Sequence, residues 1–103
     1  MGELVPVGKV DDIVDGEMAS FDAAGVRIAV ANVDGDFYAF DDSCTHRGCS
    51  LAEGDIEEHS VVCACHGGEF DIETGEVIGG PPTVPISTYE VQVEDGVIKV
   101  AVD

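Results

Sequence analysis

The chain has 103 residues, and its 22 Asp and Glu residues against four Lys and Arg give a formal net charge of −18. This length predicts one folded domain, 1–103, because a second core would not fit. The charge excludes nucleic-acid binding, since phosphates must be neutralised by basic side chains. It leaves two compatible explanations, which are solvation, including adaptation to salt, and electrostatic steering toward a basic partner.

The hydropathy pattern excludes a membrane protein. No window approaches the roughly twenty apolar residues of a spanning helix, and the first residues lack both a basic region and an apolar run. We therefore expect a soluble, cytoplasmic protein.

The first forty residues predict strands. Residues 4–9 alternate weakly and contain Pro6, which favours an edge strand, and an acidic loop follows over 10–16. A short strand is predicted over 17–22 and a buried, Val- and Ile-rich strand over 26–33. Asp34-Gly35 is typical of a tight hairpin turn, with residues 37–40 as the return strand.

The remaining sequence predicts an irregular insert and a closing hairpin. Between residues 41 and 85 Gly recurs often, which indicates loops and short hairpins, with short strands over 60–63, 69–72 and 76–78. Residues 88–94 and 97–102 predict a final hairpin through Asp95-Gly96. No segment is convincingly helical. The fold class expected is all-β, with an inserted, loop-built metal site.

Metal-ligating residues are concentrated in two short segments. All four cysteines and all three histidines fall between residues 44 and 66, and three of these cysteines and two of these histidines lie in Cys44-Thr45-His46 and Cys63-Ala64-Cys65-His66. Two Cys and two His can hold one zinc ion, or a [2Fe–2S] cluster in which two His replace two Cys on one iron. Zinc fingers usually pair like ligands on one element. Each segment here mixes one Cys with one His, which favours the cluster.

The two segments resemble the cluster-binding motifs of Rieske proteins. The similarity covers Cys44-Thr45-His46-Arg47-Gly48-Cys49 and Cys63-Ala64-Cys65-His66-Gly67-Gly68, and extends to the strands on both sides. The resemblance implies one [2Fe–2S] cluster per chain, with Cys44 and Cys63 on one iron and His46 and His66 on the other. It also implies a Rieske fold: an antiparallel β-sandwich base with a loop-rich cluster-binding subdomain over about 42–85. Gly79-Gly80-Pro81-Pro82 resembles the loop that covers the cluster; the alternative is a plain turn.

Comparison with the respiratory branch of that family gives two further expectations. There, cysteines at the positions of Cys49 and Cys65 form a disulfide, whereas two free buried thiols remain the alternative for this chain. The branch also carries a serine and a tyrosine whose hydroxyls donate to sulfur and raise the potential. Gly68 and Phe70 stand at those positions. Since neither side chain can donate, we expect a potential of about −150 mV, the low end of the Rieske range.

The absent hydroxyls at residues 68 and 70, together with the absence of a membrane-spanning segment, point to the soluble ferredoxins that serve ring-hydroxylating (aromatic) dioxygenases. The function expected is one-electron transfer from a flavin- or NAD(P)H-dependent reductase to the Rieske centre of a terminal oxygenase, by a monomer that is not itself an enzyme. Oxygen activation needs a separate iron held by two His and a carboxylate, and one spare histidine cannot supply it. The alternatives are a small subunit of a nitrite reductase or other reductase complex, and a structural zinc-binding interaction module.

Other polar residues are assigned no chemistry. His59 is expected at the surface, and Asp41 and Asp42 in a loop before the first ligand rather than as acid–base catalysts. Arg47 is either a docking residue for an acidic group of a partner or an ordinary solvated arginine.

Overall fold

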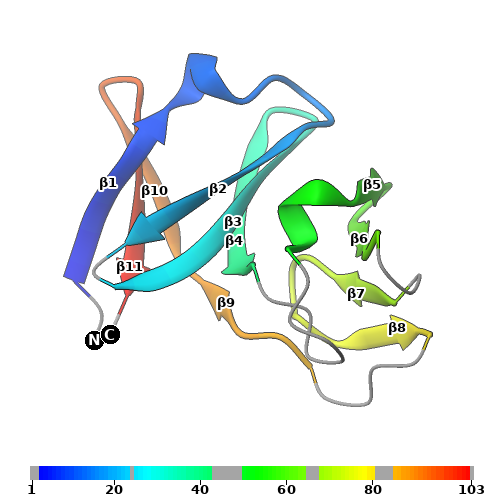
Figure 1. Cartoon of the computed structure of the whole chain (residues 1–103). Helices are drawn as coiled ribbons and strands as arrows, with labels where there is room; N and C mark the ends of the chain where they lie inside the picture. Colours follow the sequence, from blue (N-terminus) through cyan, green and yellow to red (C-terminus); the bar gives the residue numbers. More distant parts are fainter. Residues whose placement is uncertain (1–2, 24, 43–49, 65–67, 81–84, 103) are drawn as a thin grey trace.

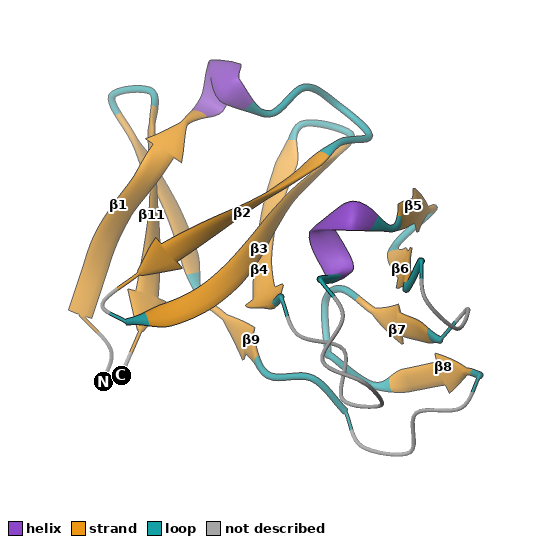
Figure 2. Ribbon diagram, in the orientation of Figure 1, coloured by secondary structure: helices purple, strands orange, loops and turns teal. Residues whose placement is uncertain are grey.

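The computed structural model describes residues 3–23, 25–42, 50–64, 68–80 and 85–102. Within them the chain forms three antiparallel sheets and two single-turn 3-10 helices, so the all-β prediction is confirmed (Figures 1 and 2). The described residues contain no helix with the length and hydrophobicity of a membrane-spanning segment.

Two of the sheets form the base. The first has the order β1-β11-β10 and the second the order β2-β3-β4-β9. Their strands are β1 (Glu3–Lys9), β2 (Met18–Ala23), β3 (Val26–Val33), β4 (Asp36–Asp41), β9 (Thr88–Tyr89), β10 (Val91–Glu94) and β11 (Val97–Val102). The 3-10 turn η1 (Val10–Asp12) follows β1. Pro6 lies in β1, an edge strand as predicted, whose register shifts between Pro6 and Gly8.

The third sheet lies beside the base and is formed by the segment between β4 and β9 (Figure 1). Its order is β5-β6-β7-β8. The strands are β5 (Asp55–Glu57), β6 (Ser60–Val62), β7 (Glu69–Asp71) and β8 (Val77–Gly79), preceded by the 3-10 turn η2 (Leu51–Glu53). The predicted loop-rich insert is thus present, and it contains one strand, β5, that the sequence did not indicate.

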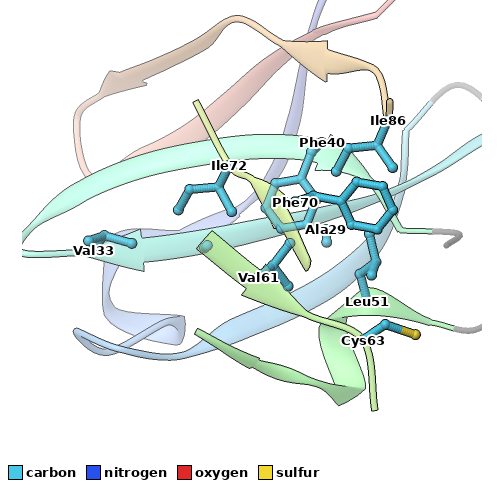
Figure 3. Packing of buried hydrophobic residues seen from close by; sticks show 10 residues of the cluster. Ala29, Val33, Phe40, Leu51, Val61, Cys63, Phe70, Ile72 and Ile86 are labelled. Atoms are coloured by element: carbon cyan, nitrogen blue, oxygen red, sulfur yellow. The ribbon is translucent and has the colours of Figure 1, made fainter. Parts of the chain in front are cut away.

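Strand β3 separates two hydrophobic cores. Its residues from Ile28 to Val33 are all buried, and successive side chains point to opposite faces of the sheet. Ile28 and Val30 pack with Ile98 and Val100 of β11 between the two base sheets, which makes the base a sandwich. The opposite face of β3 packs against the third sheet. This second core contains Ala29, Ala31, Val33, Phe40, Leu51, Val61, Cys63, Phe70, Ile72 and Ile86 (Figure 3).

The hairpin turns confirm the prediction at both Asp-Gly pairs. Asp34 and Gly35 have φ of 54° and 88°, and Asp95 and Gly96 have φ of 52° and 76°. Positive φ at both central residues matches the twist of paired strands, and Asp and Gly tolerate it better than most residues.

The prediction of one strand over 88–94 was wrong. The chain leaves β9, paired with β4 in one base sheet, and enters β10, paired with β11 in the other. Glu90, between them, is exposed, and its carbonyl accepts a hydrogen bond from the Ala101 N–H (2.9 Å). A continuous β-rich run does not reveal such a change of sheet.

Candidate metal centre

Cys63 is the one predicted ligand within the described residues. It follows β6 directly, is 2% exposed, and packs in the second core near Leu51 (Figure 3). Its backbone N–H donates to the Gly68 carbonyl (2.7 Å), which joins the two ends of the second predicted ligand segment. Cys63 is therefore held at the edge of an apolar core by a short backbone link.

The other predicted ligands, Cys44, His46 and His66, lie outside the described residues. So do Cys49 and Cys65 of the predicted disulfide, Arg47, and the residues Pro81 and Pro82 of the predicted covering loop. Among the described residues, no three His, Cys, Asp or Glu side chains are grouped so that they could hold a metal ion.

The described residues that adjoin the two predicted ligand segments nevertheless lie close together. Leu51, two residues after Cys49, lies in the same core as Cys63. Gly54 lies directly against the backbone on both sides of Cys63. A Cβ placed on Gly54 would lie 1.9 Å from the Val62 carbonyl oxygen and 3.3 Å from the Ala64 nitrogen. The exit of the first segment is thus packed against the entrance of the second.

Asp41 and Asp42 were expected in a loop. This was wrong for Asp41, which is the last residue of β4, whereas Asp42 lies in a bend after β4. Asp42 is nevertheless buried, at 1% exposure. Its carboxylate lies 2.9 Å from the Arg27 Nε and accepts hydrogen bonds from Ser50 Oγ and the Ala52 N–H. The sequence carried no signal for this, because Asp41-Asp42 looks like any other acidic pair in a chain with this composition.

Asp41 is also engaged. Tyr89 Oη donates to its Oδ1 (2.5 Å), and the Ser87 N–H donates to its Oδ2 (3.3 Å). These contacts tie the end of β4, where the chain leaves the base, to the segment where it returns.

Gly68 and Phe70 offer no side-chain donor. Gly68 is buried, and its carbonyl accepts the hydrogen bond from the Cys63 N–H. Phe70 is fully buried among the side chains of the second core (Figure 3). The environment of Phe70 is apolar.

His59 lies at the surface, as predicted, and contacts Tyr38. The two rings meet edge to face with centroids 6.4 Å apart. Tyr38 Oη donates to Glu73 Oε1 (3.2 Å), which links β4 to the turn after β7. Burial of the phenol raises the Tyr38 pKa above 10.0, and the hydrogen bond to Glu73 and the nearby carboxylates raise it further.

Comparison with known proteins decides the family. Residues 3–90 match the model of the Rieske [2Fe-2S] domain. The chain belongs to the Rieske [2Fe–2S] family. The Rieske fold predicted from the motifs is therefore confirmed, and a [2Fe–2S] cluster is the family's cofactor.

Three similar proteins carry ferredoxin in their names. The chain is 42% identical over 88 residues, 84% of this chain and 82% of the other, to a 3-phenylpropionate/cinnamic acid dioxygenase ferredoxin subunit of Shigella flexneri serotype 5b (strain 8401). A Sphingomonas yanoikuyae B1 ferredoxin superposes with a TM-score of 0.92 at 33% identity, covering 98% of this chain and all of the other. A chain in a complex of reduced oxygenase and oxidized ferredoxin in carbazole 1,9a-dioxygenase superposes with a TM-score of 0.89 at 36% identity, covering 94% of this chain and 100% of the other.

The residues present fit a Rieske cluster. Cys63 is a buried thiol at the edge of an apolar core, and such surroundings limit access of solvent to a metal site. The sequence supplies a second Cys and two His in the required mixed pairs, and the described residues place the chain after the first segment against the start of the second. Two thiolates and two imidazoles are the donor set of this cluster type.

Proposed function

We propose that this protein is the ferredoxin component of an aromatic-ring-hydroxylating dioxygenase system, a soluble cytoplasmic one-electron carrier made of one Rieske domain, residues 1–103. The observation that carries the proposal is the 42% identity to a dioxygenase ferredoxin subunit over 84% of the chain. The alternatives of a nitrite reductase subunit and of a zinc module have no comparable support.

The proposed ligands are Cys44 and Cys63 on one iron and His46 and His66 on the other, within a cluster-binding subdomain over about 42–85. When bound, the cluster supplies one-electron redox chemistry, and neutral imidazoles in place of two thiolates make it less negative. Cys63 contributes a thiolate from a fixed backbone position. Cys49 and Cys65 remain proposed disulfide partners.

The proposed partners are a flavin- or NAD(P)H-dependent ferredoxin reductase and a terminal oxygenase. A related chain has been seen in a complex of oxygenase and ferredoxin, which supports the second partner. Residues 50–80 contain eight Asp and Glu and no Lys or Arg. A partner that meets this segment is expected to present basic side chains, since complementary charge speeds encounter. We expect the carrier itself to be monomeric.

The midpoint potential tests this proposal. Hydrogen bonds to the cluster sulfurs are a main control of potential, and Gly68 and Phe70 lack the hydroxyls that raise it in the respiratory branch. We expect about −150 mV in a spectroelectrochemical titration. A value well above zero would fit quinol chemistry and contradict the assignment to an oxygenase.

Electron delivery is the complementary test. The reduced protein, mixed with an aromatic-ring oxygenase, its substrate and O₂, should be reoxidised with formation of hydroxylated product, since two molecules of the one-electron carrier supply the two electrons of one turnover. Product formation at the same rate without the carrier would count against the role.

A further inference from the structure

The buried carboxylate of Asp42 is set apart from the rest of the acidic surface. Of the acidic side chains that the structure describes, Asp42 alone is fully buried, at 1% exposure. Burying a charge costs free energy unless it is paired and hydrogen-bonded. Most of the other carboxylates that the structure describes are exposed and hydrated, but the carboxylate of Asp42 is not. Solvation of the chain therefore does not explain why Asp42 is acidic.

The partners of Asp42 satisfy both carboxylate oxygens. Ser50 Oγ lies 3.0 Å from Oδ1 and 2.8 Å from Oδ2, and the Ala52 N–H donates to Oδ1 (2.9 Å). The Arg27 Nε lies 2.9 Å from Oδ2. Arg27 is 60% exposed and lies on β3, an inner strand of its base sheet. The carboxylate thus connects the base to the start of η2.

Backbone bonds reinforce the same junction. The Asp42 N–H donates to the Arg27 carbonyl (3.3 Å), and the Leu51 N–H donates to the Asp42 carbonyl (2.6 Å). Residue 42 precedes and residue 50 follows the seven residues that contain Cys44 and His46. Main chain and side chain of Asp42 therefore hold both ends of this segment at a fixed separation.

We propose that Asp42 is a positioning residue that fixes the ends of the first ligand segment and thereby the placement of Cys44 and His46 on the irons. The inference rests on the proposed function, and it adds to that function a buried clamp made of Asp42, Ser50 and Arg27. Because the carboxylate of Asp42 is occupied by Ser50, Ala52 and Arg27, the proposed role is to position the ligand segment and not to bind iron.

The test is Asp42→Asn. The amide keeps the shape but carries no charge, and its NH₂ group, in the place of Oδ2, cannot accept a hydrogen bond from Arg27 Nε, so the ion pair with Arg27 is lost. In the presence of a chelator, the visible absorption of the variant should disappear between about 10-fold and 100-fold faster than that of the wild type. Loss of a residue that orients metal ligands weakens metal binding by a factor in this range. The electron paramagnetic resonance spectrum of the reduced variant should broaden, because the ligands are less uniformly placed.

Two controls separate positioning from stability and from charge. Ile98→Val, in the core between the base sheets, lowers thermal stability away from the clamp, and it should release the cluster no faster than its melting temperature predicts. Glu94→Gln removes a carboxylate from an exposed pair with Lys99 (3.7 Å) and should leave release rate and spectrum unchanged.

Ser50→Ala gives an independent check if Asp42→Asn does not fold. It removes only the hydroxyl contacts, so cluster release should still accelerate. If Asp42→Asn does fold, the double variant should release its cluster no faster than Asp42→Asn alone. Release from both foldable variants at the wild-type rate, or only in line with Ile98→Val, would overturn the inference and leave the proposed function intact. A wild-type protein that holds no cluster after reconstitution would overturn the proposed function itself.

Discussion

At the scale of single residues, Gly54 is a position where the chain that follows the first ligand segment lies against the start of the second. Its φ of −88° is open to any residue, so the requirement for Gly is steric and not conformational. A Cβ there would lie 1.9 Å from the Val62 carbonyl oxygen, and backbone cannot move aside as a flexible side chain can. The contact leaves no room for a methyl group.

We expect Gly54→Ala to destabilise the protein by at least about 1–3 kcal/mol, the usual cost of overpacking, and to weaken cluster retention because Cys63 must shift. Thermal unfolding measures the first effect and absorption bleaching the second. Gly79→Ala is the matched control for stability, since a Cβ at Gly79 meets nothing within 4 Å. Equal melting temperatures for the two variants would refute the steric argument.

Tyr38 gives a prediction for alkaline pH. Burial, then Glu73, raise the pKa of the phenol above 10.0, so the folded state favours the neutral form. The stability from this preference is complete below pH 10.0 and is lost as the pH rises through the raised pKa. Glu73→Gln should lower the Tyr38 pKa, seen as an earlier rise in tyrosinate absorption that Tyr38→Phe abolishes. Glu76→Gln, on the same turn, should leave the titration unchanged; an equal shift there would contradict the role of Glu73.

Sequence reasoning at this scale could propose the ligands but not the residues that support them. Cys63 and the absent hydroxyls at Gly68 and Phe70 could be proposed because Cys, His and their spacing are a specific chemical signal. Asp42 and Gly54 could not, because burial of one Asp among many and one close approach of Gly depend on tertiary contacts that no local pattern encodes.

At the scale of elements, β3 organises the molecule because both of its faces are buried. Ala29, Ala31 and Val33 face the core shared with the third sheet, while Ile28 and Val30 face β11. The base sandwich and the third sheet are therefore both packed on one strand.

The two cores should respond differently to truncation. Phe70→Leu removes part of a fully buried ring from the core that holds Cys63, so we expect lower stability together with faster cluster loss. Ile98→Val should cost about 0.5–1.5 kcal/mol of stability, without further effect on the cluster. Thermal unfolding and bleaching rates measure both quantities; bleaching that depends only on melting temperature in both variants would contradict a link between the second core and the metal centre.

Strand prediction succeeded where the pattern was local. The Val- and Ile-rich run over β3 and the Asp-Gly turns were recognised because periodicity and turn chemistry act over a few residues. The division of 88–94 into β9 and β10 was not predicted, because the choice of partner strand depends on tertiary contacts. β5 escaped because Asp55 and Glu57 have low β-propensity and pair only in the context of β6.

At the scale of the whole molecule, the dominant property is the charge of −18. The described residues contain two ion pairs, Arg27 with Asp42 and Lys99 with Glu94, so most carboxylates there have no cation to neutralise them. Such a charge distribution destabilises the compact state through self-repulsion, and dissolved salt screens it.

We therefore expect the melting temperature to rise between about 0.1 M and about 1 M KCl, where the screening length falls from about 10 Å to about 3 Å. Differential scanning calorimetry measures this, with sucrose at equal osmolality as the control for excluded solutes. A variant with Glu57→Gln, Glu58→Gln and Glu76→Gln should show a smaller rise. A melting temperature that does not depend on salt would remove the argument from self-repulsion.

The central claim is a cluster with two sulfur ligands on one iron and two nitrogen ligands on the other. Mössbauer spectroscopy of the reconstituted, oxidised protein, combined with iron and sulfide analysis, tests it most directly. The account predicts two irons and two sulfides per chain, with two unlike iron sites in equal amounts. A single metal ion per chain, or two identical iron sites, would contradict it.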